Sequence, residues 1–322
     1  MAEITRAELM QALNSAGVRF RLAGVDLSRL DLSLLNLRNA YLDWANLSAS
    51  DLRGTNLGGA SLRGANLSHC ALNGANLAEA NLNGANLNEA QLRRARMERV
   101  YLREAQLRTA DLQEAQLSQA NLHLADLSQA SLRAANLENA NLSDALLCSA
   151  NLFMSRLPGA NLMRANLNKS NLSRSDFTGG NLSEANLAVA DLDSATLHKT
   201  RLTKACLIGA DLIATDLTEA NLQGARLNGA FMSRADLTSA VLAQADLTYA
   251  DLSGANLCRA DLSGADLSNA NLSGAKLTGA ILFKANLTNA DLFKADLREV
   301  DLKDTELRVT SLHGVVFAEL NF

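Results

Sequence analysis

Residues 111–130 read DLQEAQLSQANLHLADLSQA, a stretch in which one five-residue pattern recurs four times. The same frame runs from residue 22 to residue 322, and 56 of its 61 central positions are Leu. The exceptions are Met97, Phe177, Met232, Phe317 and Phe322, all large and apolar. Ala stands two residues before the centre in 42 of the 61 units, and Asn or Asp stands directly before it in 38. The unit is therefore A-[D/N]-L-x-x.

Neither common secondary structure fits a period of five. In an α-helix, five residues advance the direction by about 140°, so the Leu side chains would form no stripe. In a flat strand, an odd step would send successive Leu side chains to opposite faces. The chain must instead turn a corner in every unit, with Ala and Leu pointing inward. Asn, Asp, Gly and Ser form such turns through local side-chain bonds and positive φ.

This unit is similar to that of the pentapeptide repeat family, and the resemblance covers residues 20–322. It implies an all-β fold, a right-handed quadrilateral β-helix with one pentapeptide per side and 20 residues per coil. The sequence alone does not fix the number of sides. With four sides, the 61 units form about 15 coils, and at about 4.8 Å per coil the solenoid is roughly 70 Å long.

The first residues lie outside the frame and define a separate segment, 1–19, before a solenoid domain at 20–322. Thr5 and Glu8 have the spacing of a capping box, with Ile4 and Leu9 as its hydrophobic staple. Leu9, Met10 and Leu13 form an apolar face, and Gly17 marks a helix end. We therefore expect a helix over residues 6–15. Capping the first coil is one role for it, because an open solenoid end exposes core and β edge. Docking to a partner is the alternative.

The C-terminal end is bulkier and more apolar than the average repeat. A thick terminal plug and an end-to-end contact between two copies, which some family members use, are both compatible with this composition. The candidate contact residues are Val315, Val316, Phe317, Leu320 and Phe322.

The sequence argues against disulfide, metal and catalytic sites. The four cysteines are widely spaced, which fits a reducing cytoplasm better than a disulfide scaffold or zinc site. The four histidines are scattered, and Asp residues before Leu are explained by the turn. No insertion breaks the frame to form a cleft. We therefore expect no catalytic, cofactor-binding or metal site and no enzymatic activity. The N-terminus does not resemble a secretion signal, and no apolar run is long enough to span a membrane.

Folding the frame into 20-residue coils predicts that the four sides differ in charge. The two turn residues after Leu32, Leu52 and their equivalents include seven basic residues against Glu114 and Asp193, a net +5. Exposed apolar residues accompany them, which is typical of a protein-binding surface. The candidate interaction face comprises Arg53, Arg93, Arg94, Arg133, Phe153, Met154, Arg174, Ile213, Phe231, Arg234, Phe293 and Lys294.

Two stretches depart from the regular repeat composition. Residues 91–108 contain six Arg spread around several faces; without interleaved aromatic residues this pattern favours surface salt bridges over nucleic acid binding. Residues 146–163 concentrate outward apolar side chains and include Pro158, so a bend, bulge or binding patch is expected there.

The leading functional hypothesis is a non-enzymatic scaffold that binds an unidentified protein partner in a bacterial cytoplasm. Its long unbroken array resembles those abundant in cyanobacteria, where some members modulate regulatory proteins. The alternative is a DNA mimic, because other pentapeptide repeat proteins resemble duplex DNA and protect gyrase from inhibitors. Residues 201–322 carry eleven bases and fifteen acids, a net −4, which favours the alternative slightly.

Overall fold

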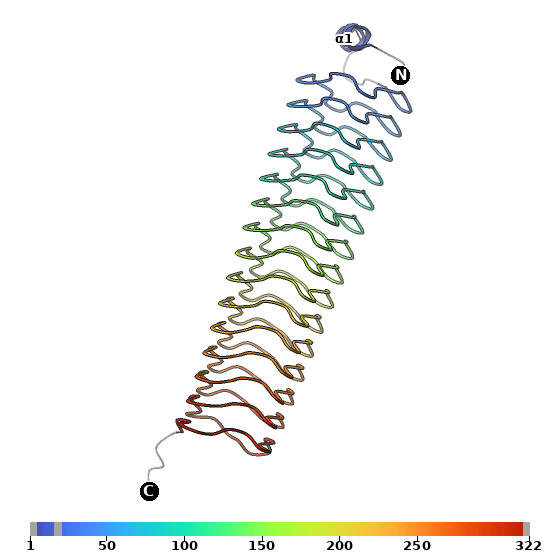
Figure 1. Cartoon of the computed structure of the whole chain (residues 1–322). Helices are drawn as coiled ribbons and strands as arrows, with labels where there is room; N and C mark the ends of the chain where they lie inside the picture. The colour runs from blue at the N-terminus through green and yellow to red at the C-terminus, as the bar shows by residue number, and fades with distance from the viewer. Residues whose placement is uncertain (1–4, 16–20, 318–322) are drawn as a thin grey trace. The chain divides into compact units, whose positions relative to one another are not determined.

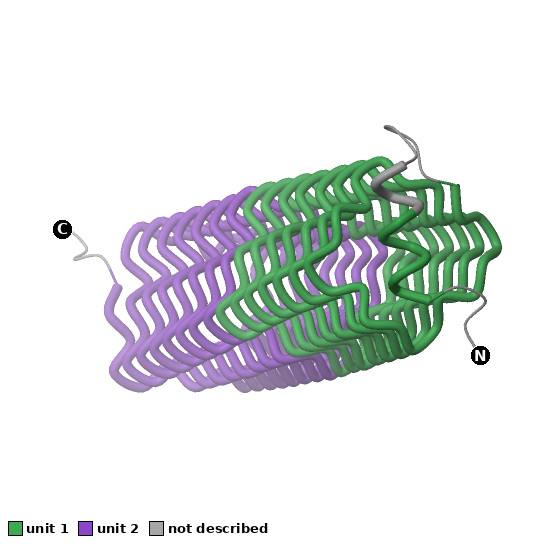
Figure 2. The backbone as a smooth tube through the Cα atoms, turned by 90° about the horizontal axis from the view of Figure 1, so that it is seen from above, with its two compact units in different colours: residues 1–161 green, residues 162–322 purple. Residues whose placement is uncertain are grey.

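A computed structural model describes residues 5–15 and 21–317. The chain divides into two compact units, unit 1 at Met1–Asn161 and unit 2 at Leu162–Phe322, which Figure 2 colours separately. Each unit is a stack of coils (Figure 1). Within the described residues the α-helix α1, Arg6–Ser15, is the one element longer than an isolated bridge.

Parallel bridges between residues 20 apart define the register of both units. In unit 1 they run from Arg21↔Tyr41 to Asn141↔Asn161, and in unit 2 from Asn166↔Asn186 to Asp296↔Val316. One bridging residue comes from each pentapeptide, directly before the central Leu. Twenty residues correspond to four pentapeptides, so each coil has four sides with a turn at every corner.

A repeat with Asn or Asp before its central Leu uses all five of its backbone N–H groups. In unit 1 the Asn136 and Leu137 N–H groups donate to Ala115 in the coil before and Arg156 in the coil after, at 3.0 and 2.7 Å. The Asn139 N–H donates to the Pro158 carbonyl at 2.9 Å, and the Ala140 N–H closes the turn on Leu137 at 3.0 Å. The remaining N–H, of Glu138, donates to Oδ1 of Asn136 at 3.2 Å. The preference for Asn or Asp before Leu follows, because this side chain accepts the N–H that no carbonyl takes.

The second turn residue has positive φ in every described repeat, as the sequence predicts. Gly occupies sixteen of these positions, between +61° and +72°. Many others hold Asn, Ser, Lys, Arg or Glu, and even the β-branched Val189 adopts φ 57°. A left-handed non-Gly residue costs roughly 1–2 kcal/mol, so the turn is imposed by the coil-to-coil hydrogen bonds on either side of it.

The core is built from the central Leu and the Ala two residues before it, and nearly all are fully buried. Phe177 fits at a central position with 0% exposure. Where Ser or Thr replaces Ala, its hydroxyl finds a carbonyl, so no buried donor is lost. Thr55 Oγ1 donates to the Leu32 carbonyl at 2.8 Å, and Thr200 Oγ1 donates to the Phe177 carbonyl at 2.9 Å.

Helix α1 has the bounds that the sequence predicts, and its capping box is present. The Thr5 N–H donates to Glu8 Oε2 at 2.7 Å, and the Glu8 N–H donates to Thr5 Oγ1 at 3.3 Å. The hydrogen bonds from Thr5 hold the pKa of the Glu8 carboxyl below its usual value. Leu9 is fully buried, whereas Met10 is 43% exposed. The predicted staple residue Ile4 and helix stop Gly17 lie outside the described residues.

A matched pair of leucines in one repeat tests the assignment of inward and outward positions. Leu122 is fully buried, and Leu124, two residues later, is 45% exposed. We expect Leu122→Ala to destabilise the protein by about 2–5 kcal/mol because it leaves a cavity. Leu124→Ala should change the stability by less than about 0.5 kcal/mol. Urea denaturation followed by circular dichroism measures both, and equal losses would contradict the core assignment.

Candidate interaction surface

Outward side chains occupy three positions in each pentapeptide, the bridging residue and the two turn residues. The coil length decides which of them meet. A first turn residue lies beside the bridging residue 18 positions later, as Asn73 Nδ2 shows by donating to Gln91 Oε1 at 3.3 Å. In unit 2, Asn256 Nδ2 donates in the same way to Thr238 Oγ1 at 2.8 Å. Charges on one side are therefore counted over all three positions.

The predicted basic residues of unit 1 are largely paired with acids of the same side. Arg53 Nη2 lies 2.5 Å from Asp51 Oδ2, Arg93 pairs with Asp111, and Arg94 Nε lies 2.7 Å from Glu114 Oε2. The hydrogen bond and charge of Arg94 lower the pKa of Glu114. Four Arg on this side face four acids, so its net charge is zero. These acids are Asp31, Asp51, Asp111 and Glu114.

A different contact holds the fourth arginine of this side. The Arg133 guanidinium lies over the Phe153 ring, 5.5 Å from its centroid. Met154, in the same turn as Phe153, is 50% exposed. Cation–π contacts at exposed sites contribute about 0.5–1 kcal/mol. The side therefore presents an apolar and aromatic group rather than a free basic stripe.

An open depression lies on the same side of unit 1. It has a volume of about 360 Å³ and is lined by Asn73, Gly74, Arg93, Arg94, Gln113 and Glu114. Gly74 has no atom within 4 Å of the position a Cβ would take, so the depression widens there. Its charged groups are already paired, and the depression holds no buried acid–base pair.

The six arginines of residues 91–108 all form ion pairs. Beyond Arg93 and Arg94, Arg103 Nε lies 3.0 Å from Glu104 and Arg108 Nη1 lies 3.6 Å from Asp126. Arg99 pairs with Glu79, and Arg96 Nε lies 3.7 Å from Glu98. The predicted salt-bridged surface is confirmed.

The candidate side of unit 2 carries more acidic than basic residues. Its basic residues are Arg174, Arg234 and Lys294, whereas its acids are Asp191, Asp193, Asp211, Asp251 and Asp291, a net −2. The sequence count omitted the bridging positions, where four of these acids stand. Phe293 stacks on His313 at 5.7 Å between ring centroids, and Lys294 lies 5.0 Å over Phe293. Ile213 is half-buried and Phe231 is 52% exposed.

The candidate face omits two exposed aromatic residues of this unit, Tyr249 and Phe283, of which Tyr249 is the more exposed. Tyr249 is 70% exposed, in the turn before Asp251. It stands in a different corner from the basic turn residues and was left out for that reason. A search for large apolar side chains at positive-φ turn positions would have found it.

The candidate end contact is partly described. Val315 is half-buried, and Val316 and Phe317 are 49% and 48% exposed. Leu312 stands at the central position, whose residue is buried in most other coils, but it is 41% exposed. Leu320 and Phe322 lie outside the described residues.

The family model for pentapeptide repeats matches overlapping segments of this sequence that together span residues 21–308. The chain belongs to the pentapeptide repeat family. Among residues 5–15 and 21–317, no group of three or more His, Cys, Asp or Glu side chains could hold a metal ion. In the same residues, no helix has the length and apolar character needed to cross a bilayer.

Solved pentapeptide repeat proteins are similar to this chain. HetL from the cyanobacterium Nostoc, which is involved in heterocyst differentiation regulation, is 29% identical over 98% of both chains, with a TM-score of 0.27. A thylakoid lumen protein of Arabidopsis thaliana is 31% identical over 29% of this chain and 64% of its own, with a TM-score of 0.28. QnrB1, a plasmid-mediated fluoroquinolone resistance protein, is 18% identical over 59% of this chain and 92% of its own, with a TM-score of 0.32. No curated protein matches at a significant level.

The ion pairs of this pentapeptide repeat surface predict weak binding to polyanions. In Asp111→Asn/Glu114→Gln, Arg93 and Arg94 lose their partners, and we expect elution from heparin at clearly higher salt than for the parent protein. Asp246→Asn/Asp266→Asn is the control, because it changes the net charge equally without freeing an arginine. Equal shifts for both variants would show that net charge, and not pairing, controls retention.

Proposed function

We propose that this protein is a non-enzymatic interaction scaffold whose coil sides bind a protein partner in a regulatory role. Its membership of a family of repeat proteins supports the scaffold. The observation that carries the proposal is the exposure of large apolar side chains where the repeat tolerates small polar ones. Tyr249 and Phe231 are 70% and 52% exposed, and Met154 is 50% exposed. Such groups add little to folding stability, and exposed apolar patches are typical of binding surfaces.

The proposal places the contacts on the candidate sides of both units. In unit 1 it relies on Phe153, Met154 and Arg133 more than on Arg53, Arg93 and Arg94, whose charges are neutralised locally. In unit 2 it relies on Ile213 and Phe231, with Arg234 in the turn that follows Phe231 and Phe293 three coils further along. Rim charges of this kind affect the rate of association more than its strength.

The architecture in this proposal is one solenoid domain at residues 20–322, of about 15 coils, preceded by a capping segment at 1–19. Three contacts support a cap. Leu9 is fully buried, Arg6 Nη1 lies 2.7 Å from Asp31 Oδ1, and Arg6 Nη2 donates to the Ser33 carbonyl at 3.2 Å. The exposed Met10 leaves room for the docking alternative.

At the other end, we propose a homodimer contact through Val315, Val316 and Phe317, with Leu320 and Phe322 as further candidates. The exposure of central residues in the last coils supports it, because a second copy would cover them. The proposed compartment is the cytoplasm, which the four free thiols fit.

Partner capture with a consensus variant tests the scaffold. Phe153→Ser/Met154→Gly inserts the commonest residue at each of these two turn positions, so the fold is retained. We expect a partner captured from extracts of the source organism to be lost or strongly reduced with this variant. Arg93→Gln/Arg94→Gln should weaken capture less, because the charges of these two arginines are neutralised by Asp111 and Glu114. Unchanged capture by both variants would exclude the candidate side of unit 1.

A second candidate function is DNA mimicry, with DNA gyrase as the partner. One observation favours it: in unit 2, Asp246 and Asp266 bridge one coil apart, and neither forms an ion pair among the described residues. Regularly spaced free carboxylates can imitate phosphates. A gyrase supercoiling assay with an inhibitor decides. Protection from the inhibitor supports mimicry. The absence of both binding and protection would rule this candidate out.

A further inference from the structure

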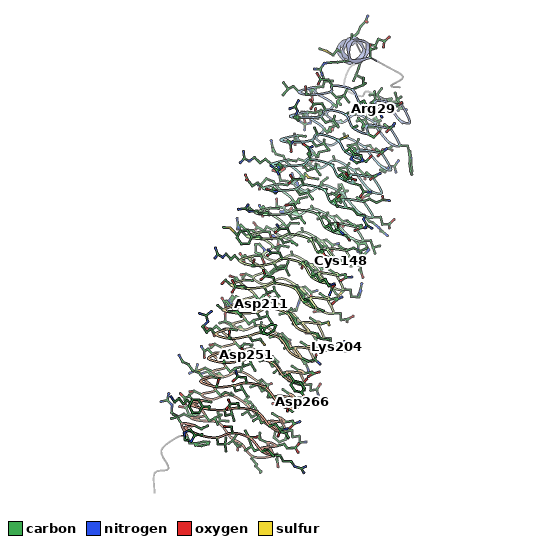
Figure 3. All side chains as sticks on the ribbon, viewed as in Figure 1. Arg29, Cys148, Lys204, Asp211, Asp251 and Asp266 are labelled. Atoms are coloured by element: carbon green, nitrogen blue, oxygen red, sulfur yellow. The ribbon has the colours of Figure 1, made fainter. Side chains whose placement is uncertain are left out.

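Phe231 stands at a bridging position of unit 2, between Asp211 and Asp251 one coil to either side. Figure 3 labels these two aspartates, which lie one above the other along the unit. A phenylalanine cannot accept the turn N–H that Asn or Asp accepts at this position. Among the described residues, the Ser233 N–H has no protein acceptor, whereas the Ile213 and Ser253 N–H groups each donate to the aspartate two residues before them at 3.0 Å.

This substitution brings the fold no evident gain. Phe231 is 52% exposed, so about half of its apolar surface remains in water. The turn loses a side-chain hydrogen bond, which costs about 0.5–1.5 kcal/mol. A residue that weakens its turn and stays exposed is better explained by binding than by folding.

The two flanking carboxylates are free of ion pairs in the part of the chain that the structure describes. Asp211 Oδ1 accepts the Ile213 N–H, and Asp251 Oδ1 accepts Asn271 Nδ2 at 2.9 Å besides the Ser253 N–H. In unit 1, Asp51 and Asp111 occupy the same kind of position, yet both pair with arginines. The difference arises at the first turn residues beside each acid. Arg53 follows Asp51, and Arg93 precedes Asp111 by 18 residues. In unit 2 the corresponding residues are Asp193 and Ile213 for Asp211, and Ser233 and Ser253 for Asp251.

Two apolar side chains extend the surface around the ring. Ile213 precedes Phe231 by 18 residues, the offset at which Asn256 and Thr238 side chains meet in the same unit. Tyr249, 70% exposed, stands at the corner before Asp251. We call Asp211, Ile213, Phe231, Tyr249 and Asp251 the Phe231 patch. It is an apolar centre with a carboxylate above and below.

The spacing of the patch selects the shape of the partner. Adjacent coils lie about 4.8 Å apart, so the aspartates are about 9.6 Å apart with the ring midway. On an α-helix, residues i and i+7 lie on one face about 10.5 Å apart, with i+3 and i+4 between them. An extended strand brings residues to one face every 6.6 Å or so and matches less well.

We propose that the Phe231 patch binds a basic amphipathic helix, with Arg or Lys at i and i+7 on the two aspartates and an apolar residue at i+3 or i+4 against Phe231. The helix lies along the stack of coils in unit 2. This inference rests on the proposed scaffold function and specifies the chemical class of partner. Charge complementarity and an exposed aromatic anchor are the two features that carry it.

The test is binding of a synthetic helical peptide, with Arg at i and i+7, Leu at i+3 and i+4, and Ala and Gln elsewhere. Fluorescence anisotropy of the labelled peptide gives Kd for the full chain. Phe231→Asn restores the residue favoured at this position and should weaken binding at least about tenfold. Asp211→Asn/Asp251→Asn keeps both turn acceptors and should weaken binding about fivefold, with a smaller dependence on salt.

Three controls make the result decisive. Asp216→Asn/Asp236→Asn removes two unpaired carboxylates of another side of unit 2 and should leave Kd unchanged. A peptide of the same composition with Arg and Leu on opposite faces should bind at least about tenfold more weakly. Circular dichroism confirms that the variants remain folded. The inference is overturned if the peptide fails to bind, or binds the Phe231→Asn and Asp211→Asn/Asp251→Asn variants like the parent. Because partner capture is tested separately on unit 1, that outcome leaves the scaffold function standing.

Discussion

The structure depends on how the backbone N–H directly after Leu is satisfied in the repeats that carry Asn or Asp before Leu. Four of the five N–H groups reach carbonyls of neighbouring coils or of the same turn, and the fifth, directly after Leu, reaches the side chain before Leu. This requirement selects Asn or Asp there, and the coil-to-coil bonds impose positive φ one residue later. Leu and Ala fill the core that results. The turn residues take part mainly through their backbone, which leaves their side chains available for other contacts.

The 20-residue register also determines which outward side chains are neighbours on the surface. A side chain meets others 2, 18 or 20 positions away, so its pairing depends on residues remote in the chain. Arg53 pairs with Asp51, Arg93 with Asp111, and Arg94 with Glu114, and these pairs neutralise the candidate side of unit 1. In unit 2 the equivalent acids Asp211 and Asp251, on either side of Phe231, have no arginine at the neighbouring first turn positions and form no ion pair among the described residues. One repeat thus produces surfaces of different chemistry without any change of backbone.

Features set by the local sequence could be predicted. They include the five-residue frame, the buried Leu and Ala, the positive-φ corners, the turn role of Asn and Asp, and the helix at residues 6–15. The coil length could not be worked out from the residues, because it depends on packing between coils, and it came from the family resemblance. The charge of the candidate face was misjudged because the count stopped at turn residues, whereas Asp111 approaches Arg93 from the next coil. Tyr249 was missed because it stands in a different corner from the basic turn residues that define the candidate face.

The central claim is the 20-residue register, and hydrogen-bond scalar couplings between ¹⁵N and carbonyl ¹³C measure it directly in the deuterated protein. The account predicts couplings from Leu117 N to the Asn136 carbonyl and from Leu247 N to the Asp266 carbonyl, both bonds being 2.7 Å long. Within each unit, the same offset of 19 should recur at the central Leu residues whose coil has a successor in that unit. Couplings at offsets of 14 or 24 would indicate three or five pentapeptides per coil and would contradict the account, together with every side-chain pairing drawn from it.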